Sequence, residues 1–259
     1  MTMISNGMAI DKFRSYSSVF SRSSFIKLLQ HDDYSFINAK IERYDLSSLT
    51  ELLLSKYGVK NTIAINEFRV GNSIADLVMF NGTSKAFEIK TELDSDKRLG
   101  GQMADYTKIF KECYIITHES LVEKYRQEDD RIGIIALTKR PKSVVMHEIR
   151  PAKENKIIDV DTLIRSIRTA EYKSIVKKYY VELPEMNSFN MFETCRGLMK
   201  EIPGDQLHQL FIDELKKRKS NTNIINTFSI ELRQMCFALN IDLNLYRELD
   251  FKLSKKINI

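Results

Sequence analysis

A hairpin signal constrains the fold of this chain more than any other feature. Two runs of β-favouring residues, 73–80 and 85–92, flank the turn residues 81–84. A turn centred on its glycine places Asp76 directly opposite Glu88. A slip of one residue would move Asp76 onto the apolar face of the hairpin, so the pattern favours the first register. The sequence therefore predicts two opposed carboxylates within a sheet.

Opposed carboxylates need a positive charge between them, because like charges in a cross-strand pair are destabilising. Lys90 follows Glu88 by two residues and so lies on the same face of the strand. We expect an oxygen-ligand site for a hard divalent ion, with an ammonium beside it. Removing either acid is then expected to stabilise the metal-free protein.

The pattern resembles the signature of the PD-(D/E)XK nuclease superfamily. Asp76 on one strand is followed by Glu88-Ile89-Lys90 on the next, and Ala75 stands where the name of the motif has proline. Downstream, Gln102 and Tyr106 resemble the Gln-x-x-x-Tyr helix motif of the RecB-like branch. A strand–turn–strand followed by such a helix makes the pattern more specific than its single residues.

The predicted elements divide the chain into three parts. Residues 46–150 carry the resemblance, and their helices and strands follow one another in the order of the αβββαβ core of restriction-endonuclease-like proteins. We therefore expect an α/β fold with a mixed sheet. Residues 151–259 read as an all-helical region, and residues 1–45 as a helical lead-in. The core is predicted from a helix at 46–57, strands at 62–70, 73–80 and 85–92, a helix at 97–111, a strand at 112–117, a helix at 119–127, and strands at 133–138 and 143–150.

The resemblance implies roles for the hairpin residues. Asp76, Glu88 and the backbone carbonyl of Ile89 would bind Mg²⁺ or Mn²⁺, and Lys90 would position the attacking water and counter charge on the phosphate. Glu67, on the preceding strand, is a further catalytic candidate. It either supplies a third carboxylate or is an edge-strand charge that pairs with a neighbouring cation.

A second set of candidates lies on the predicted helix 97–111. Arg98, Gln102 and Tyr106 recur at four-residue spacing, which places a guanidinium, an amide and a phenol along one flank. Such a row suits contacts with substrate or phosphate. The alternative is that Tyr106 belongs to the core and Gln102 is its solvated neighbour.

Composition narrows the class of protein. The 259 residues carry a net charge of +5, which is compatible with a polyanionic partner without requiring one. Three isolated cysteines and four scattered histidines form no zinc or disulfide pattern, and we find no apolar run long enough to cross a membrane. We expect a cytoplasmic protein that does not enter a membrane.

The predicted function is a metal-dependent nuclease, an endonuclease whose expected substrate is DNA, since the resembled families are chiefly DNA enzymes. One alternative is a non-catalytic module that binds nucleic acid or protein on the same fold. Another is a nuclease effector of a bacterial defence or mobile-element system, with a protein partner bound by residues 151–259. The sequence leaves open the choice between DNA and RNA, the choice between endonuclease and exonuclease action, and the oligomeric state.

Overall fold

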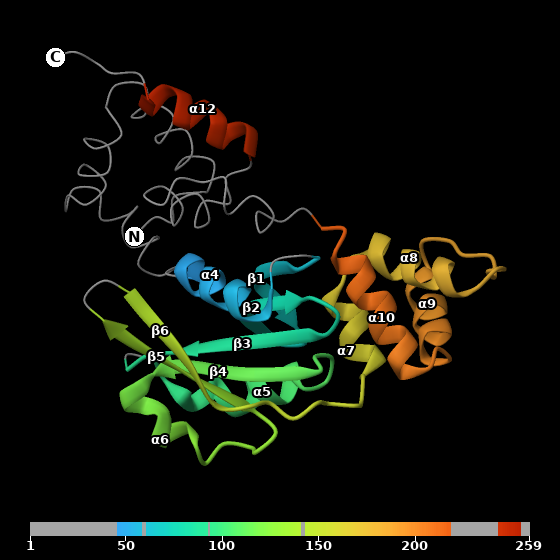
Figure 1. The fold of residues 1–259 in the computed structure, drawn as a ribbon. Coiled ribbons are helices and arrows are strands. Elements are labelled where there is room, and N and C mark those ends of the chain that lie inside the picture. Colours follow the sequence, from blue (N-terminus) through green and yellow to red (C-terminus); the bar gives the residue numbers. More distant parts are fainter. Residues whose placement is uncertain (1–45, 59–60, 93, 141–142, 219–242, 255–259) are drawn as a thin grey trace, which may run out of the picture. The chain divides into compact units, whose positions relative to one another are not determined.

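The computed structural model describes residues 46–58, 61–92, 94–140, 143–218 and 243–254 (Figure 1). The chain forms two compact units, of which one spans residues 60–220 and the other combines residues 1–59 with 221–259. The predicted lead-in at 1–45 lies outside the described residues, and so do positions 219–242 and 255–259 of the predicted all-helical region. Among the described residues, no helix is long and apolar enough to span a membrane.

The unit of residues 60–220 is built on a six-stranded mixed sheet in the order β1-β2-β3-β4-β5-β6. The first three strands are antiparallel, β3, β4 and β5 are parallel, and β6 is antiparallel to β5. The expected α/β class with a mixed sheet is confirmed at this level. The strands are β1 (Ile63–Val70), β2 (Ser73–Phe80), β3 (Ser84–Lys90), β4 (Glu112–His118), β5 (Gly133–Arg140) and β6 (Ser143–Arg150).

The hairpin of β2 and β3 has the predicted register. Phe80 pairs with Ser84 and Leu77 pairs with Phe87 across a turn in which Gly82 has a φ of +104°, a conformation that glycine adopts without strain. The paired ladder ends at Leu77 and Phe87. Beyond this point, the Ile89 N–H donates at 2.7 Å to the Asp76 side chain and not to a backbone carbonyl of β2.

Strand β1 has an irregularity at Glu67, whose φ is +53°. Ile63 and Phe68 both pack into the core, although strict alternation would send them to opposite faces of the strand. A left-handed residue between them permits this change of face, at a cost of about 1–3 kcal/mol for a residue other than glycine. The flanking pairs, Asn66 with Leu77 and Phe68 with Ala75, place Glu67 across from Asp76.

Short helices connect the strands. The predicted helix at 97–111 is a 3₁₀ turn, η2 (Asp96–Arg98), followed by α5 (Leu99–Tyr106). The predicted helix at 119–127 is η3 (Glu119–Leu121) followed by the single turn α6 (Val122–Tyr125). Both predictions were too long, because helical periodicity does not show where tertiary contacts end a helix.

Helices after the sheet belong to the same compact unit. They are α7 (Val160–Ser166), α8 (Thr169–Tyr179), α9 (Met191–Lys200) and α10 (Gly204–Leu215), gathered at one end of the sheet (Figure 1). Their apolar residues join residues of the sheet and α5 in one hydrophobic core. Phe211 of α10, for example, meets Phe80 of β2 edge-to-face at 5.4 Å. The predicted boundary after residue 150 falls inside this unit.

In the other unit, the structure describes α4 (Leu46–Tyr57) and α12 (Leu243–Ser254). Helix α4 has the predicted bounds and ends at Gly58, whose N–H bonds to the Leu54 carbonyl at 2.8 Å and whose φ is +94°. This left-handed glycine terminates the helix.

Candidate active site

Glu88 is the centre of a hydrogen-bond network between β3 and α5. Its side chain is buried, and the whole residue is only 2% exposed. One carboxylate oxygen, Oε1, accepts from Lys90 Nζ at 2.8 Å and from Gln102 Nε2 at 2.6 Å. The other, Oε2, accepts from the Tyr106 hydroxyl at 2.7 Å. The structure therefore brings four sequence-predicted residues together.

Lys90 compensates the charge of Glu88. The lysine is 7% exposed, and its Nζ also donates to Gln102 Oε1 at 3.2 Å. Thr117 of β4 donates its hydroxyl to the Lys90 carbonyl at 2.8 Å, which ties the end of β3 to the neighbouring strand. An ammonium held by two partners has a well-defined position.

Tyr106 is part of the core and of the network at once. Its ring is fully buried, and its hydroxyl lies 2.7 Å from the Ile74 carbonyl as well as from Glu88. Burial and the nearby Glu88 carboxylate raise the pKa of the Tyr106 phenol, so the hydroxyl stays protonated and donates. The two interpretations of Tyr106 in the sequence are therefore compatible.

Asp105 positions α5 against the β1–β2 turn. Its Oδ2 accepts from the Asn72 N–H at 3.2 Å and from the Ser73 hydroxyl at 2.8 Å. A Cβ on Gly71, which has a φ of +57°, would come within 3.1 Å of this carboxylate. Asp105 lies within the Gln-x-x-x-Tyr segment but is not among the residues predicted from the sequence.

Asp76 lies on the Glu88 side of the hairpin, half-buried and bonded to the Ile89 amide. Burial, and then the negative charge of Glu88, raise the pKa of Asp76 to about 6, while the Ile89 N–H and Lys90 oppose the rise. In the metal-free protein, ionised Asp76 is therefore disfavoured compared with an exposed aspartate.

Glu67 and Arg98 are both exposed, and neither is hydrogen-bonded to Glu88. Glu67 is exposed on β1, opposite Asp76 in the register. Arg98 is exposed in η2, one residue before α5, so it does not continue the helical row of Gln102 and Tyr106. Within the part of the chain that the structure describes, the Arg98 side chain makes no hydrogen bond or ion pair, and it caps no backbone N–H of α5.

The acids offer a small set of oxygen ligands. Among the described residues, no group of three or more His, Cys, Asp and Glu side chains is arranged to bind a metal ion. Asp76 Oδ1 accepts no hydrogen bond from a described residue, and Glu88 Oε2 has capacity for a second partner. Mg²⁺ in proteins is often bound by one or two carboxylates together with water and substrate phosphate. The residues present fit such a site.

Comparison with known proteins identifies the family. The family model described as Bacteriophage P4 protein cII matches residues 38–236. The chain belongs to this family. Protein cII of Enterobacteria phage P4 is 26% identical over 184 residues, which are 68% of this chain and 67% of that protein. The family match includes every candidate site residue.

A solved structure gives a weaker likeness. The SPO1766 protein of unknown function from Silicibacter pomeroyi matches with a TM-score of 0.35 and 12% identity, over 56% of this chain and 93% of that protein. The likeness is too slight to bear on fold or function.

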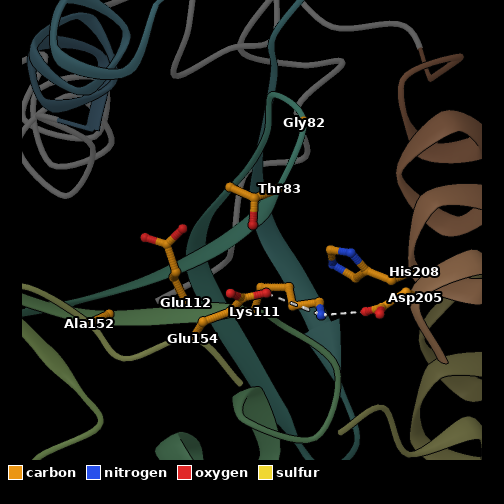
Figure 2. A pocket seen from close by; sticks show the side chains of 8 residues that line it. All are labelled: Gly82, Thr83, Lys111, Glu112, Ala152, Glu154, Asp205 and His208. Atoms are coloured by element: carbon orange, nitrogen blue, oxygen red, sulfur yellow. Dashed lines mark hydrogen bonds and ion pairs between the residues drawn. The ribbon is translucent and has the colours of Figure 1, made fainter. Parts of the chain in front are cut away.

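In this member of the P4 cII family, a polar pocket lies at the amino-terminal end of β3, the end opposite to Glu88 and Lys90. Its volume is about 500 Å³, and Figure 2 shows Lys111 between Glu154 and Asp205, with His208 beside Asp205 on α10. Lys111 Nζ lies 3.0 Å from Asp205 and 3.3 Å from Glu154. The charges at the mouth of this pocket thus largely satisfy one another.

Behind the pocket, Ser84 joins β3 to two distant segments. Its hydroxyl oxygen accepts the Lys111 N–H at 3.0 Å and lies 2.7 Å from Nε2 of His208, 124 residues away along the chain. His208 is buried, as expected for a structural histidine, whereas His118 and His147 are exposed. No sequence pattern indicated this contact.

His208 is expected to make the family member less stable in acid. Burial, and then the positive charge of Lys111, lower the pKa of His208 to about 4 from 6.5, against the opposing effect of Asp205 and Glu154. A lowered histidine pKa means that the fold favours the neutral imidazole, so stability is highest when the pH is above 6.5, the pKa in the unfolded chain. This stability is lost as the pH falls from 6.5 towards 4. The expected loss reaches about 3 kcal/mol in the free energy of unfolding. Urea unfolding between these pH values should show a weaker acid dependence in His208→Gln than in wild type.

The exposed control His118→Gln should match wild type, and an unchanged acid dependence in His208→Gln would contradict the assignment.

Proposed function

We propose that the protein is a Mg²⁺- or Mn²⁺-dependent nuclease that hydrolyses phosphodiester bonds, with DNA as its substrate. The observation that carries the proposal is the convergence of Asp76, Glu88 and Lys90 on neighbouring strands, backed by Gln102 and Tyr106 from the following helix. An acid pair with an ordered ammonium suits a phosphate whose negative charge increases during hydrolysis.

The restriction-endonuclease-like core is part of this proposal. Within the unit of residues 60–220, the order β1, β2, β3, α5, β4 agrees with the βββαβ part of that core, and β4 joins β3 in parallel, as a connection through a helix allows. This agreement comes from element order and strand pairing, and so supports the motif independently of its residues.

Each residue has a role in the proposed reaction. Asp76, Glu88 and the Ile89 carbonyl would bind the divalent ion, which when bound supplies Lewis-acid polarisation of the phosphate and a more acidic water. Lys90 orients the attacking water and offsets negative charge on the phosphate, while Gln102 holds the ammonium of Lys90 in place.

The remaining candidates lie around this centre. Tyr106 keeps Glu88 oriented by donating its hydroxyl to Oε2. Glu67, across from Asp76, would complete the metal shell, directly or through water. Arg98, exposed at the start of the helix, would contact substrate phosphate.

A non-catalytic nucleic-acid-binding module on the same fold is the second candidate. It is favoured by the fact that Glu88 already accepts three hydrogen bonds, so that its charge is compensated by Lys90 without a metal. Such a network can serve as a structural link between β3 and α5 alone. Metal-dependent cleavage separates the two candidates.

A protein partner for the helical part of the chain is a separate proposal, consistent with a role as a nuclease effector of a defence or mobile-element system. Val181 and Phe189 lie between α8 and α9 and are almost wholly exposed. An exposed phenylalanine is the kind of large apolar side chain that can enter a pocket of a partner protein. A pull-down with the full chain should lose its partner in a Val181→Ser, Phe189→Ser double variant.

Cleavage assays with variants of two buried lysines test the proposed nuclease activity. Circular and linear DNA, single- and double-stranded, and RNA are incubated with Mg²⁺, Mn²⁺ or chelator. We expect Lys90→Met to reduce cleavage roughly 100-fold or more, because it removes the ammonium nearest the phosphate. Lys85→Met is the matched control, since Lys85 is also buried in β3 and ion-paired, with Glu112.

The outcome of this assay decides the proposal. Cleavage that requires metal and Lys90 but survives Lys85→Met supports it, and the circular substrate distinguishes endonuclease from exonuclease action. Cleavage that persists in chelator, or that is unchanged in Lys90→Met, would overturn it.

A further inference from the structure

A cavity opens at the carboxyl ends of the parallel strands, beside the proposed active site. Its volume is about 360 Å³, within the range of small-molecule sites. The floor and walls are aliphatic: Ile89 and Ile116, which are paired neighbours on β3 and β4, with Leu121 of η3 and Leu137 of β5. Three of these four side chains are only partly buried, so the surface is open to a ligand.

The rim of the cavity is polar. Thr91, Glu92, His118 and Ser120 line it and are exposed. The Ser120 N–H points to His118 Nδ1 at 3.2 Å, so this nitrogen acts as an acceptor and neutral His118 has its proton on Nε2. An aliphatic floor with hydroxyls and an imidazole N–H at its edge suits a flat heterocycle that has polar groups on its perimeter.

The cavity and the proposed catalytic residues share the end of β3. The Ile89 amide binds Asp76 while the Ile89 side chain lines the cavity, and Lys90 borders both. Because neighbouring residues of a strand face opposite sides, Ile89 points away from the side of Glu88 and Lys90. Lys90 also lines the cavity, so a nucleotide whose phosphate lies at Asp76 and Lys90 can place its base in the cavity at the strand end.

We propose that this cavity binds an unpaired nucleobase adjacent to the phosphate that is cleaved, an inference that rests on the proposed nuclease function. A base stacked in a duplex cannot leave its partner to enter the cavity without being extruded. The substrate class is therefore single-stranded nucleic acid, or a duplex with an unpaired nucleotide. Contact with the base is through the aliphatic floor and independent of the metal.

The test measures binding by the full chain in chelator, so that cleavage does not interfere. Two fluorescent single strands of equal length are compared, one of thymidine nucleotides and one of abasic nucleotides with the same phosphates. We expect wild type to bind the thymidine strand about tenfold more tightly, because burying roughly 55 Å² of apolar base surface on the aliphatic floor gives a factor of about this size. Leu121→Trp, which fills the cavity, should reduce thymidine binding to the abasic level and leave abasic binding unchanged.

Control variants make the result specific. Leu210→Trp changes a half-buried leucine on α10, outside the cavity, and should keep the preference for thymidine. Leu137→Asn makes the floor polar without adding bulk and should also weaken the preference for thymidine. This variant tests the site even if Leu121→Trp does not fold. Equal affinity of wild type for both strands, or a preference that survives Leu121→Trp and Leu137→Asn, would refute the base site.

The proposed nuclease function would be contradicted by a different outcome from the one that contradicts the base site. A protein that binds neither strand nor any duplex refutes both the nuclease and the base site. A protein that cleaves with Mg²⁺ but binds abasic and thymidine strands equally keeps the first and refutes the second.

Discussion

Replacing Asp76 by asparagine is expected to abolish Mg²⁺-dependent cleavage and at the same time to stabilise the metal-free protein. The loss of activity follows from the loss of a metal ligand, and we expect a decrease of roughly 1,000-fold or more, which corresponds to several kcal/mol in the barrier. Asparagine retains a carbonyl oxygen that can accept the Ile89 N–H, so the hairpin geometry is preserved.

The gain in stability has a defined pH dependence. The pKa of Asp76 is raised from 3.8 to about 6 by burial and by Glu88. A raised carboxyl pKa favours folding while the group is protonated, and this contribution is lost as the pH rises through 6. Asparagine avoids the loss, so Asp76→Asn should be more stable than wild type by about 3 kcal/mol near neutral pH, with almost no gain below pH 3.8.

Urea unfolding in chelator at both ends of this pH range, together with the cleavage assay, tests both parts. A variant that cleaves like wild type would exclude Asp76 from the site. A variant that loses cleavage but is destabilised near neutral pH would indicate that the Asp76 charge supports the fold, contrary to the effect of its burial.

Replacing Glu88 by alanine is expected to destabilise the protein by about 3–5 kcal/mol, because it leaves the buried ammonium of Lys90 without its carboxylate. This reverses the expectation from sequence that removal of either acid stabilises the metal-free protein. The reason is that Lys90 lies 2.8 Å from Glu88 and already compensates the charge that was expected to be repelled.

A double variant isolates this cause. Glu88→Leu combined with Lys90→Met removes both charges and replaces them by side chains of similar volume, so most of the lost stability should return. Urea unfolding of the single and double variants gives the comparison. Glu112→Ala is the control, since Glu112 pairs with buried Lys85 but is itself more exposed, and its loss should be smaller. A double variant as unstable as Glu88→Ala would show that Tyr106 and Gln102, rather than Lys90, need the carboxylate.

Local rules were sufficient for the hairpin and for part of the site. Turn residues and the two-residue alternation of strands predicted the pairing of Phe80 with Ser84, and with it the common side of Asp76, Glu88 and Lys90. Helical spacing placed Gln102 and Tyr106 on one flank of α5, where both bond to Glu88. These relations involve residues within one or two adjacent elements, and so they can be inferred from spacing.

Only the tertiary structure decided what depends on burial and on distant contacts. Spacing gave no indication that Glu67 is left-handed, that Arg98 precedes the helix, or that Asp105 anchors the helix to the β1–β2 turn. The raised pKa of Asp76 likewise arises from its burial in the folded chain and from the nearby charge of Glu88. The sequence by itself determined which chemical groups share the hairpin. Packing of α5 and the neighbouring strands decided how these groups are paired and protonated, because desolvation and long-range hydrogen bonds exist only in the folded chain.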